Sequence, residues 1–329
     1  MMRSWLVADT DADGWAAALD GIDHCFAHRR DFAGLMGRAA GTRTKLFVAE
    51  GDGCKAVCPI AERSYRGATD VFTPYGFSGF AGTGDLSQLP DAWRAFAQGQ
   101  GYVAGYIMQH PLAMPGRLAG AWPEMSDAGR TLYRVDLTVG EEERLRALSS
   151  KKRAQRLRKW LEATSIETDQ ARLAEAFVRL YPDLMSRRGA GSVYRFSDDI
   201  LRDLVRLPGT VLVGVCDAAG EVTSVAQMGI APACGEYLFV AAGETSSGDG
   251  DGLLWLGLRA LADRGARACN LGGGIREGDG LSDFKRRLGG EPVPIPVLRQ
   301  IFDAPRYQAL CATAGCDPDK TDFFPAYYR

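Results

Sequence analysis

Three short apolar runs follow one another in the second half of the chain, with turn residues between them. They restrict this half to a fold that contains a β-meander. The three runs are Thr210–Cys216, Val222–Ile230 and Tyr237–Ala241. A helical pattern over residues 252–264 and a short apolar run over 268–271 follow the meander. Alternation of strands and helices at this spacing predicts an α/β domain.

The remaining elements complete the order of this domain. We expect a strand over Thr131–Leu137, a helix over KKRAQRLRKWLEA capped by Ser149 or Ser150, and a long helix over Ala171–Arg187. A further helix begins near Ser197. The order strand–helix–helix–strand–strand–strand–helix–strand over residues 130–298 is typical of an acetyltransferase-like (GNAT-like) half. The first half shows a shorter version of this order, and 329 residues suffice for two domains. Its predicted elements are a helix over 26–38, hairpin strands over 45–50 and 54–62, a helix over 88–99 and a strand over 102–109.

Charge and apolar patterning exclude several classes of protein. The formal net charge of −2 leaves no global basic field of the kind that nucleic-acid-binding proteins use, so such contacts must come from local patches. No apolar run is long enough to span a bilayer, and the first residues lack a secretory signal. We therefore expect a cytoplasmic protein with no membrane span.

Eight cysteines in a chain of this length do not indicate a disulfide framework. Cys54 and Cys58, with Cys311 and Cys316, superficially resemble two halves of a zinc site, but neither pair has the tight Cys-x-x-Cys spacing. We interpret them as ordinary buried thiols and predict no metal.

The segment NLGGGIREGDGLSDFKRRLGG, residues 270–290, is the most informative for chemistry. Three glycines directly after a strand permit close backbone approach by another group. Such a segment can place backbone N–H groups and Lys285 around a developing negative charge. The alternative is a flexible loop that ends in a solvated basic helix. The segment is not a phosphate-binding Walker loop, because its lysine comes too late.

Three basic clusters lie in the second half of the chain. On a helical wheel Lys152, Arg156 and Lys159 fall on one side of KKRAQRLRKW, opposite its apolar residues. The other clusters are Arg187-Arg188 with the nearby Arg195, and Lys285 with Arg286 and Arg287. They are either solvated faces or, if folding brings them together, a local surface for phosphate groups.

The aromatic segment FTPYGFSGF, residues 72–80, combines chain-breaking residues with flat side chains. Around Tyr75 and Gly76 it suits either a substrate platform or a loop packed on the core. The three histidines, His24, His28 and His110, belong to no HExxH or nucleophile-elbow motif. Because no nucleophile–base pair is evident, the residues favour direct transfer without a covalent enzyme intermediate.

Taken together, these landmarks resemble the Fem family of aminoacyl-tRNA-dependent, non-ribosomal peptidyltransferases, in particular its compact members without a coiled-coil arm. The resemblance covers roughly residues 24–310. The matching stretches are YRVDLTVGEEERLRALSSKKRAQRLRKW, LYPDLMSRRGAGSVYRFSDDIL, NLGGGIREGDGLSDFK and TPYGFSGF. It implies tandem acetyltransferase-like domains, one formed by residues 1–136 with 296–329 and the other by residues 137–295.

Family members move an amino acid from its tRNA ester to an amine, usually on a peptidoglycan precursor and in some relatives on a small secondary metabolite. The resemblance implies that Lys285 stabilises the tetrahedral oxyanion, accompanied by Phe284. Arg195 falls near a position that contacts acceptor phosphate. The implied substrate-binding residues are Tyr75, Gly76, Tyr194, Arg195, Gly273 and Gly274. The implied tRNA-binding residues are Lys152, Arg156, Lys159, Arg286 and Arg287.

The match departs from the family pattern at two positions of the first domain. A family lysine is replaced around Gly34, and an aspartate once proposed as a base falls near Gln109. These changes motivate the hypothesis of a smaller amine acceptor. We expect no cofactor besides aminoacyl-tRNA as co-substrate, and a monomer. The alternatives are an acyl-CoA-dependent N-acyltransferase, whose usual pyrophosphate loop is not evident, and a non-catalytic binding module.

Overall fold

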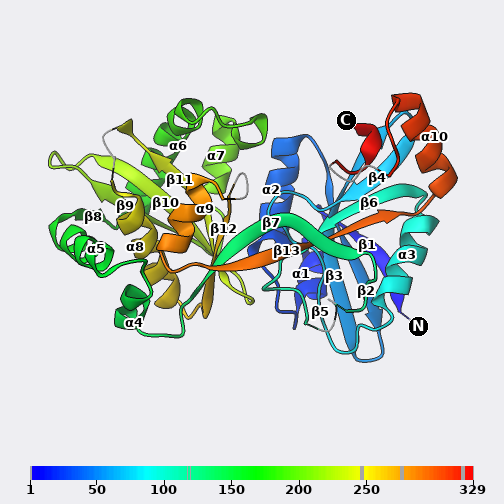
Figure 1. The fold of residues 1–329 in the computed structure, drawn as a ribbon, viewed down its shortest axis with the longest axis horizontal. Helices are drawn as coiled ribbons and strands as arrows, with labels where there is room; N and C mark the ends of the chain where they lie inside the picture. Colours follow the sequence, from blue (N-terminus) through cyan, green and yellow to red (C-terminus); the bar gives the residue numbers. More distant parts are fainter. Residues whose placement is uncertain are drawn as a thin grey trace. The chain divides into compact units, whose positions relative to one another are not determined.

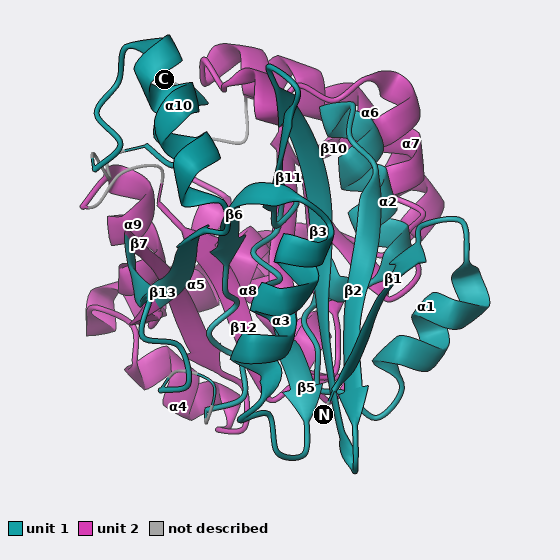
Figure 2. Ribbon diagram, turned by 90° about the vertical axis from the view of Figure 1, so that its right-hand side faces the viewer, with its two compact units in different colours: residues 1–128, 295–329 teal, residues 129–294 magenta. Residues whose placement is uncertain are grey.

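The computed structural model describes residues 2–116, 118, 120–244, 248–274, 278–319 and 323–328. The chain forms two compact units, residues 1–128 with 295–329 (unit 1) and residues 129–294 (unit 2), shown in Figures 1 and 2. The divisions between the units fall within two strands, β7 (Met125–Asp136) and β13 (Glu291–Ile301). The sequence analysis places this boundary after residue 136, at the end of β7, whereas the units divide after residue 128. A strand that serves two units carries one continuous pattern, so its sequence does not mark where one unit stops.

Unit 1 is a sheet in the order β1-β2-β3-β4-β6-β13, with β5 paired to β3. All its strand pairs are antiparallel except β4 with β6. Its other strands are β1 (Arg3–Ala8), β2 (Thr44–Gly51), β3 (Cys54–Tyr65), β4 (Ala68–Phe72), β5 (Ala81–Thr83) and β6 (Tyr102–Met108). Its helices are α1 (Ala12–Leu19), η1 (Phe26–His28), α2 (Arg30–Ala40), α3 (Leu89–Gly99), α10 (Ala304–Ala314) and η4 (Ala326–Tyr328).

Strand β2 separates two cores in unit 1, because side chains alternate across a strand. Phe47 packs in an aromatic cluster with Trp93 of α3. Its neighbours Leu46 and Val48 belong to a second core with Trp15 of α1. Both faces of the sheet are therefore covered, which explains why β2 reads as a continuous apolar run.

Unit 2 is a sheet in the order β7-β12-β11-β10-β9-β8. All its strand pairs are antiparallel except β11 with β12. Its remaining strands are β8 (Ser165–Glu167), β9 (Thr210–Cys216), β10 (Val222–Ile230), β11 (Gly235–Ala242) and β12 (Ala268–Gly273). Its helices are α4 (Glu141–Arg146), α5 (Lys151–Ala163), α6 (Gln170–Arg187), η2 (Ser192–Tyr194), α7 (Asp198–Leu204), α8 (Gly250–Ala262) and α9 (Gly280–Arg287).

Strand β10, in the middle of the unit 2 sheet, is also buried on both faces. Met228 lies in a core with α8, where a side chain at Gly257 would collide with its sulfur. The adjacent Gln227 faces the other side and donates from Nε2 to the carbonyl of Leu204 in α7 at 2.6 Å. Helices on both faces of a sheet are the predicted α/β arrangement.

The two units share one order of elements. Each has a strand, a helical segment, a three-stranded antiparallel meander, a helix and a parallel strand. Strands β1, β2, β3, β4 and β6 thus correspond to β8, β9, β10, β11 and β12. The sequence places the strand over 131–137 first in the second domain, but β7 pairs with β12 and the strand in that position is β8. With three residues, β8 is too short to show a period.

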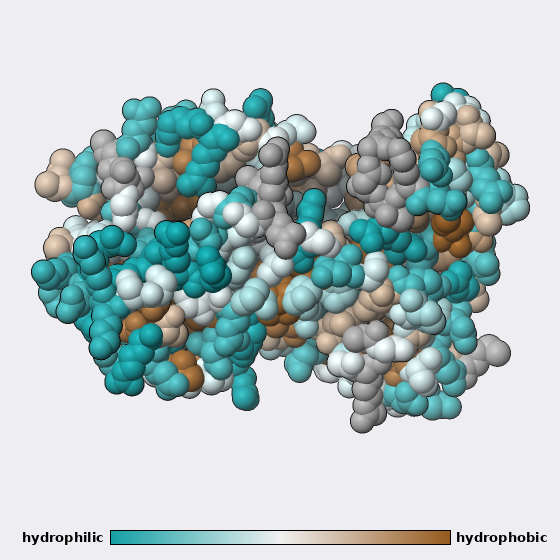
Figure 3. Space-filling view, in the orientation of Figure 1, coloured by the Kyte–Doolittle hydropathy of each residue, from teal (hydrophilic) through white to brown (hydrophobic). Residues whose placement is uncertain are grey.

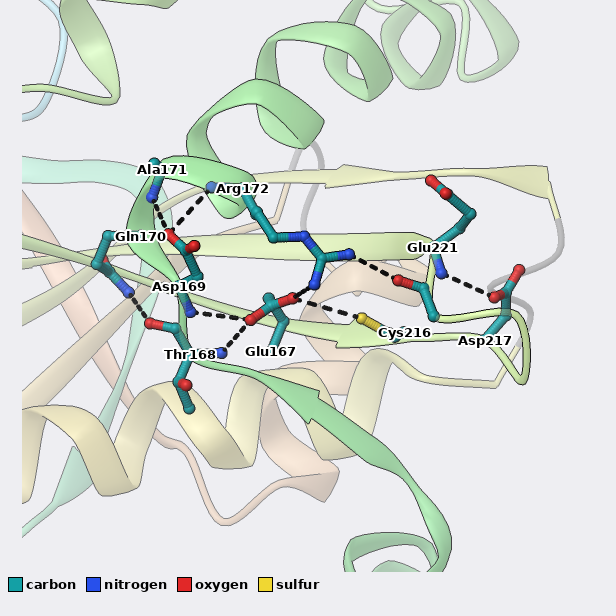
Figure 4. Close-up of polar contacts among 10 residues, drawn as sticks. Glu167, Thr168, Asp169, Gln170, Ala171, Arg172, Cys216, Asp217 and Glu221 are labelled. Atoms are coloured by element: carbon teal, nitrogen blue, oxygen red, sulfur yellow. Dashed lines mark hydrogen bonds and ion pairs between the residues drawn. The ribbon is translucent and has the colours of Figure 1, made fainter.

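Polar contacts rather than apolar burial hold β8 in place (Figure 4). One carboxylate oxygen of Glu167 accepts from the backbone N–H groups of Thr168 and Asp169. The other pairs with Arg172 of α6, which also donates to the carbonyl of Gly220. These contacts join β8 to the start of α6 and to the β9–β10 turn, so we assign them to the fold.

Within the described residues no helix is both long enough and apolar enough to cross a membrane. The longest of these helices is α6, with 18 residues, and it packs on its own sheet through six buried side chains. These are Leu173, Ala176, Phe177, Leu180, Tyr181 and Leu184.

Candidate functional site

Helix α9 holds Lys285 in a defined place. The carboxylate of Asp279 caps the helix by accepting from the N–H of Ser282 at 2.7 Å. The helix ends in a turn where the N–H of Gly290 donates to the carbonyl of Lys285 at 3.1 Å. Lys285 is 4% exposed, whereas Arg286 and Arg287 are exposed and pair with Asp283. One helix thus directs one cation inward and two outward.

The ammonium group of Lys285 reaches the glycine-rich end of β12. Its Nζ donates to the carbonyl oxygen of Gly273 at 2.7 Å. A side chain at Gly272 would stand 3.3 Å from Nζ, and the φ of Gly272 is +71°. Glycine is required there, because an L side chain would be strained and would crowd the ammonium.

Burial lowers the pKa of Lys285 to about 8, although the negative charge of Asp279 acts in the opposite direction. No carboxylate among the described residues forms an ion pair with it. At neutral pH the group remains mostly protonated, roughly nine parts in ten. It is therefore a poorly solvated cation that a new anionic partner would stabilise.

Strands β11 and β12 part next to this lysine. Their parallel pairing is confined to Gly235 with Cys269 and Glu236 with Asn270. Beyond this point the Asn270 side chain accepts from the N–H of Gly272 at 2.7 Å, and Gly273 pairs with Leu132 of β7. Residues 275–277 of the predicted glycine-rich segment lie outside the described part of the chain. The carboxyl ends of strands that diverge are a common place for ligands in α/β sheets.

The other predicted substrate residues of unit 2 lie on different segments. Phe284 packs at the edge of the core, with its ring 3.5 Å from where a side chain at Gly250 of α8 would stand. Tyr194 is 36% exposed, and its carbonyl accepts from the hydroxyl of Tyr181 at 3.0 Å. Arg195 is exposed and donates from Nε to the carbonyl of Ala190. Of the predicted set in unit 2, Lys285 and Gly273 are in contact. The roles expected for the N–H groups of Gly273 and Gly274 stay predictions.

The basic face of α5 lies on the surface. Ser150 caps the helix, accepting from the N–H of Arg153 at 3.2 Å, and Ala154 and Leu157 are buried. Lys152, Arg156 and Lys159 are exposed, and the surface over α4 and α5 is largely hydrophilic (Figure 3). Arg156 lies 3.6 Å from a carboxylate oxygen of Asp251. Part of its charge is thus already balanced, whereas no ion pair neutralises Lys152 or Lys159 within the described residues.

In unit 1 the predicted aromatic segment forms the loop between β4 and β5. Tyr75 is 39% exposed. Gly76 has a φ of +115°, and a side chain there would meet the Ala27 methyl at 2.7 Å. This loop therefore packs closely on η1. Gly34 lies on α2, where an added Cβ would meet no atom within 4 Å, so the place of the family lysine is open.

Sequence reasoning missed a buried polar cluster at the end of β6. The side chain of Gln109 accepts from the N–H of Phe80 at 2.8 Å, while its Nε2 has no hydrogen-bond partner among the residues that the structure describes. His28 and His110 are fully buried nearby, linked through the backbone of Ser78 and Gly79. Their separation along the chain hides this arrangement. A local signal is the Cys-x-x-His spacing of Cys25 and His28.

No protein-family model and no curated protein sequence matches the chain. Solved structures do match over nearly its whole length. The structure of FemX is 13% identical, with a TM-score of 0.69 over 93% of this chain and 99% of that one. The fold is FemX-like. The L-PGS structure from Bacillus licheniformis is also 13% identical, with a TM-score of 0.60 over 93% and 98%.

A third match is the C-terminal domain of a putative lysylphosphatidylglycerol synthetase from Agrobacterium fabrum. It is 14% identical, with a TM-score of 0.57 over 92% of this chain and 97% of that one. At these identities the likeness to FemX concerns the fold. It confirms the predicted class of tandem acetyltransferase-like α/β domains.

Proposed function

We propose that the chain is an aminoacyltransferase that moves an amino acid from aminoacyl-tRNA to an amine and forms an amide bond. The observation that carries the proposal is the buried ammonium of Lys285 at the glycine-rich end of β12, with no carboxylate partner among the described residues. A FemX-like fold is consistent with this reaction class.

The chemistry needs few groups. An aminoacyl ester is already activated, so an amine can attack its carbonyl without a metal or a covalent enzyme intermediate. The attack develops a negative charge on the ester oxygen. A cation that is already desolvated, as Lys285 is, stabilises this oxyanion more strongly than a solvated one. During the reaction its ammonium would exchange the Gly273 carbonyl for the more negative oxyanion.

The exposed basic face of α5 supports a nucleic-acid-linked donor. The cations of Lys152 and Lys159 are available to phosphate groups, in a chain whose net charge is slightly negative. We assign tRNA contacts to Lys152, Arg156 and Lys159 of this face, with Arg286 and Arg287 on the outer side of α9.

Unit 1 supports a small amine as acceptor, such as one on a secondary metabolite, in preference to a nucleotide-linked peptidoglycan precursor. Where family members carry a lysine and an aspartate, this unit has Gly34 and the neutral Gln109. Neither can pair with the charges of a nucleotide-linked precursor. An acceptor panel tests this part, because exclusive use of the nucleotide-linked cell-wall precursor would reject a smaller amine.

The donor is tested by incubating the protein with amine acceptors and with aminoacyl-tRNA, acyl-CoA or neither. Product formation is followed by mass spectrometry. We expect transfer from aminoacyl-tRNA alone, abolished when the tRNA is treated with ribonuclease before the reaction. Transfer from acyl-CoA would replace the proposal with an N-acyltransferase. Transfer from neither donor with any acceptor, in a folded protein that still binds tRNA, would favour a binding module.

A further inference from the structure

Helix α10 of unit 1 carries a cysteine in its last turn, and a second cysteine follows the helix. These residues are Cys311 and Cys316. The N–H of Cys316 donates to the carbonyl of Cys311 at 3.0 Å, and the N–H of Gly315 donates to the carbonyl of Ala312 at 3.2 Å. The φ of Gly315 is +69°. This pair of hydrogen bonds around a left-handed glycine is a Schellman motif, a frequent way to end a helix.

A Schellman motif brings two particular side chains together. They belong to the residue that accepts the longer of its two bonds and to the residue that donates it, and they are usually apolar. In this chain both are cysteines. The Sγ of Cys316 lies 3.6 Å from the carbonyl oxygen of Cys311, and the two thiols are hydrogen-bonded to each other. The turn therefore holds two thiols in contact.

The two thiols differ in their access to solvent. Cys311 is fully buried, on the face of α10 that also buries Tyr307 and Leu310, whereas Cys316 is half-buried. Burial raises the pKa of the Cys311 thiol to about 11, and its hydrogen bond with Cys316 acts in the same direction. Because an exposed thiolate is the form that reacts with an oxidant, Cys316 reacts first and Cys311 second.

We propose that Cys311 and Cys316 form a reversible disulfide at the end of α10, with a small-molecule disulfide as the oxidant. The Cys316 thiolate attacks one sulfur of the oxidant and displaces the other as a thiol. The Cys311 sulfur then attacks the Cys316 sulfur, which forms the internal S–S bond and displaces the second small thiol. In total the two protein thiols lose two protons and two electrons, and the oxidant gains them as two thiols. The motif that ends the helix is thereby also a modification site.

The same unit contains a matched pair of cysteines that cannot react in this way. Cys54 is half-buried and Cys58 is fully buried, as in the proposed pair. Their spacing in the sequence is nearly the same, but both lie on the extended strand β3. Four residues of a strand span about 13 Å, so the two sulfurs cannot meet while the sheet is intact. This pair is an internal control for oxidation of the folded protein.

The test uses the full chain, first reduced and then incubated with oxidised glutathione under native conditions. Free thiols are alkylated, and tryptic peptides are identified by mass spectrometry. Cys311 and Cys316 share one peptide, between Arg306 and Lys320. We expect this peptide to lose two hydrogens, about 2 Da, and to take up no alkylating reagent until it is reduced again. A peptide that stays fully alkylated, or that carries only glutathione on Cys316, would overturn the proposal. So would an equal yield of cross-linked Cys54 and Cys58, because the oxidation would then report unfolded chains.

Two variants test the order of the steps. In Cys311→Ala the second sulfur is missing, so glutathione should remain on Cys316 as a stable mixed disulfide. In Cys316→Ser the buried Cys311 should stay reduced and alkylate only after the protein is denatured. If Cys311→Ala does not fold, the wild-type peptide and Cys316→Ser still decide. Rapid uptake of glutathione by Cys311 in folded Cys316→Ser would contradict the assigned roles and overturn the proposed exchange.

Discussion

The two units have the same order of elements, yet unit 2 buries a cation and unit 1 buries neutral polar groups at corresponding strand ends. In unit 2 the end of β12 receives the ammonium of Lys285. In unit 1 the corresponding strand, β6, is followed directly by Gln109 and His110, which are neutral and fully buried. A repeated fold thus supplies two equivalent places, one with a buried cation and the other with buried neutral amide and imidazole groups.

Replacing the buried cation should produce the largest effect. We expect Lys285→Ala to lower kcat by on the order of 10²–10³, because one oxyanion donor is removed. Lys45→Ala is the control, since Lys45 of unit 1 pairs with Glu62 at 2.9 Å on a partly exposed surface. Steady-state kinetics, with circular dichroism to verify folding, measure the difference. Near-normal turnover of Lys285→Ala would remove the catalytic distinction between the units.

Two buried glutamines, one in each unit, allow the stability and the acceptor binding of the units to be compared. Gln109 of unit 1 accepts from the Phe80 N–H, and Gln227 of unit 2 donates to the Leu204 carbonyl. Gln109→Leu leaves the Phe80 N–H without its acceptor and should lose about 1–3 kcal/mol of unfolding free energy. Gln227→Leu should lose less within that range, because the Leu204 carbonyl still accepts from the N–H of Leu207 at 3.3 Å. Denaturant titration measures this loss.

Only Gln109→Leu should also raise the KM for the amine acceptor, because we place the acceptor in unit 1. Equal KM values for the two glutamine variants would contradict that placement.

The pH dependence of kcat/KM tests whether Lys285 acts as a cation. With a pKa of about 8, Lys285 is cationic at neutral pH and loses its charge as the pH rises past 8. Oxyanion stabilisation needs the cation, so kcat/KM should fall about tenfold per pH unit above that value. An arginine stays protonated throughout. The residual activity of Lys285→Arg should therefore lack this alkaline decline, and a decline at the same pH in both proteins would assign it to another group.

The smallest expected effect concerns the basic face of α5. Lys152→Ala and Lys159→Ala should each weaken tRNA binding and reduce the slope of log affinity against log salt by about 0.7–0.9 for each phosphate that is no longer neutralised. Arg156→Ala should change the slope less, because Asp251 already balances part of its charge. Binding measured at several salt concentrations tests this order. An unchanged slope in both lysine variants would place the tRNA elsewhere.

Elements with strong local signals were predictable from the sequence. Strands β9 and β10 have the bounds that their apolar runs and flanking turns predict. The missed elements have weaker signals. Strand β1 and helix α1 at the amino terminus were not expected, and β8 has three residues held by polar contacts.

The candidate site was likewise predictable only in part. The pattern FKRRL, with the apolar Phe284 and Leu288, predicts a short helix with one buried face. It left open whether Lys285 lies on that face or in solvent with Arg286 and Arg287. Its bond to the carbonyl of Gly273 does not follow, since the sequence suggested N–H groups at that point. The proximity of Cys25 to His110 could not be predicted either, because it depends on how the five strands β2 to β6 and the helices α2 and α3 fold between them.

The chain passes from unit 1 to unit 2 within β7 and returns to unit 1 within β13, so unit 2 is an insertion between the two parts of unit 1. The ribosome therefore completes unit 2 while unit 1 still lacks β13, where Gln300 accepts from the indole of Trp93 at 2.8 Å. It also lacks Tyr327, whose hydroxyl donates to Asp70 at 2.5 Å. During translation the amino-terminal sheet therefore has an uncovered edge until unit 2 has been synthesised, and residues 295–329 can cover it only afterwards.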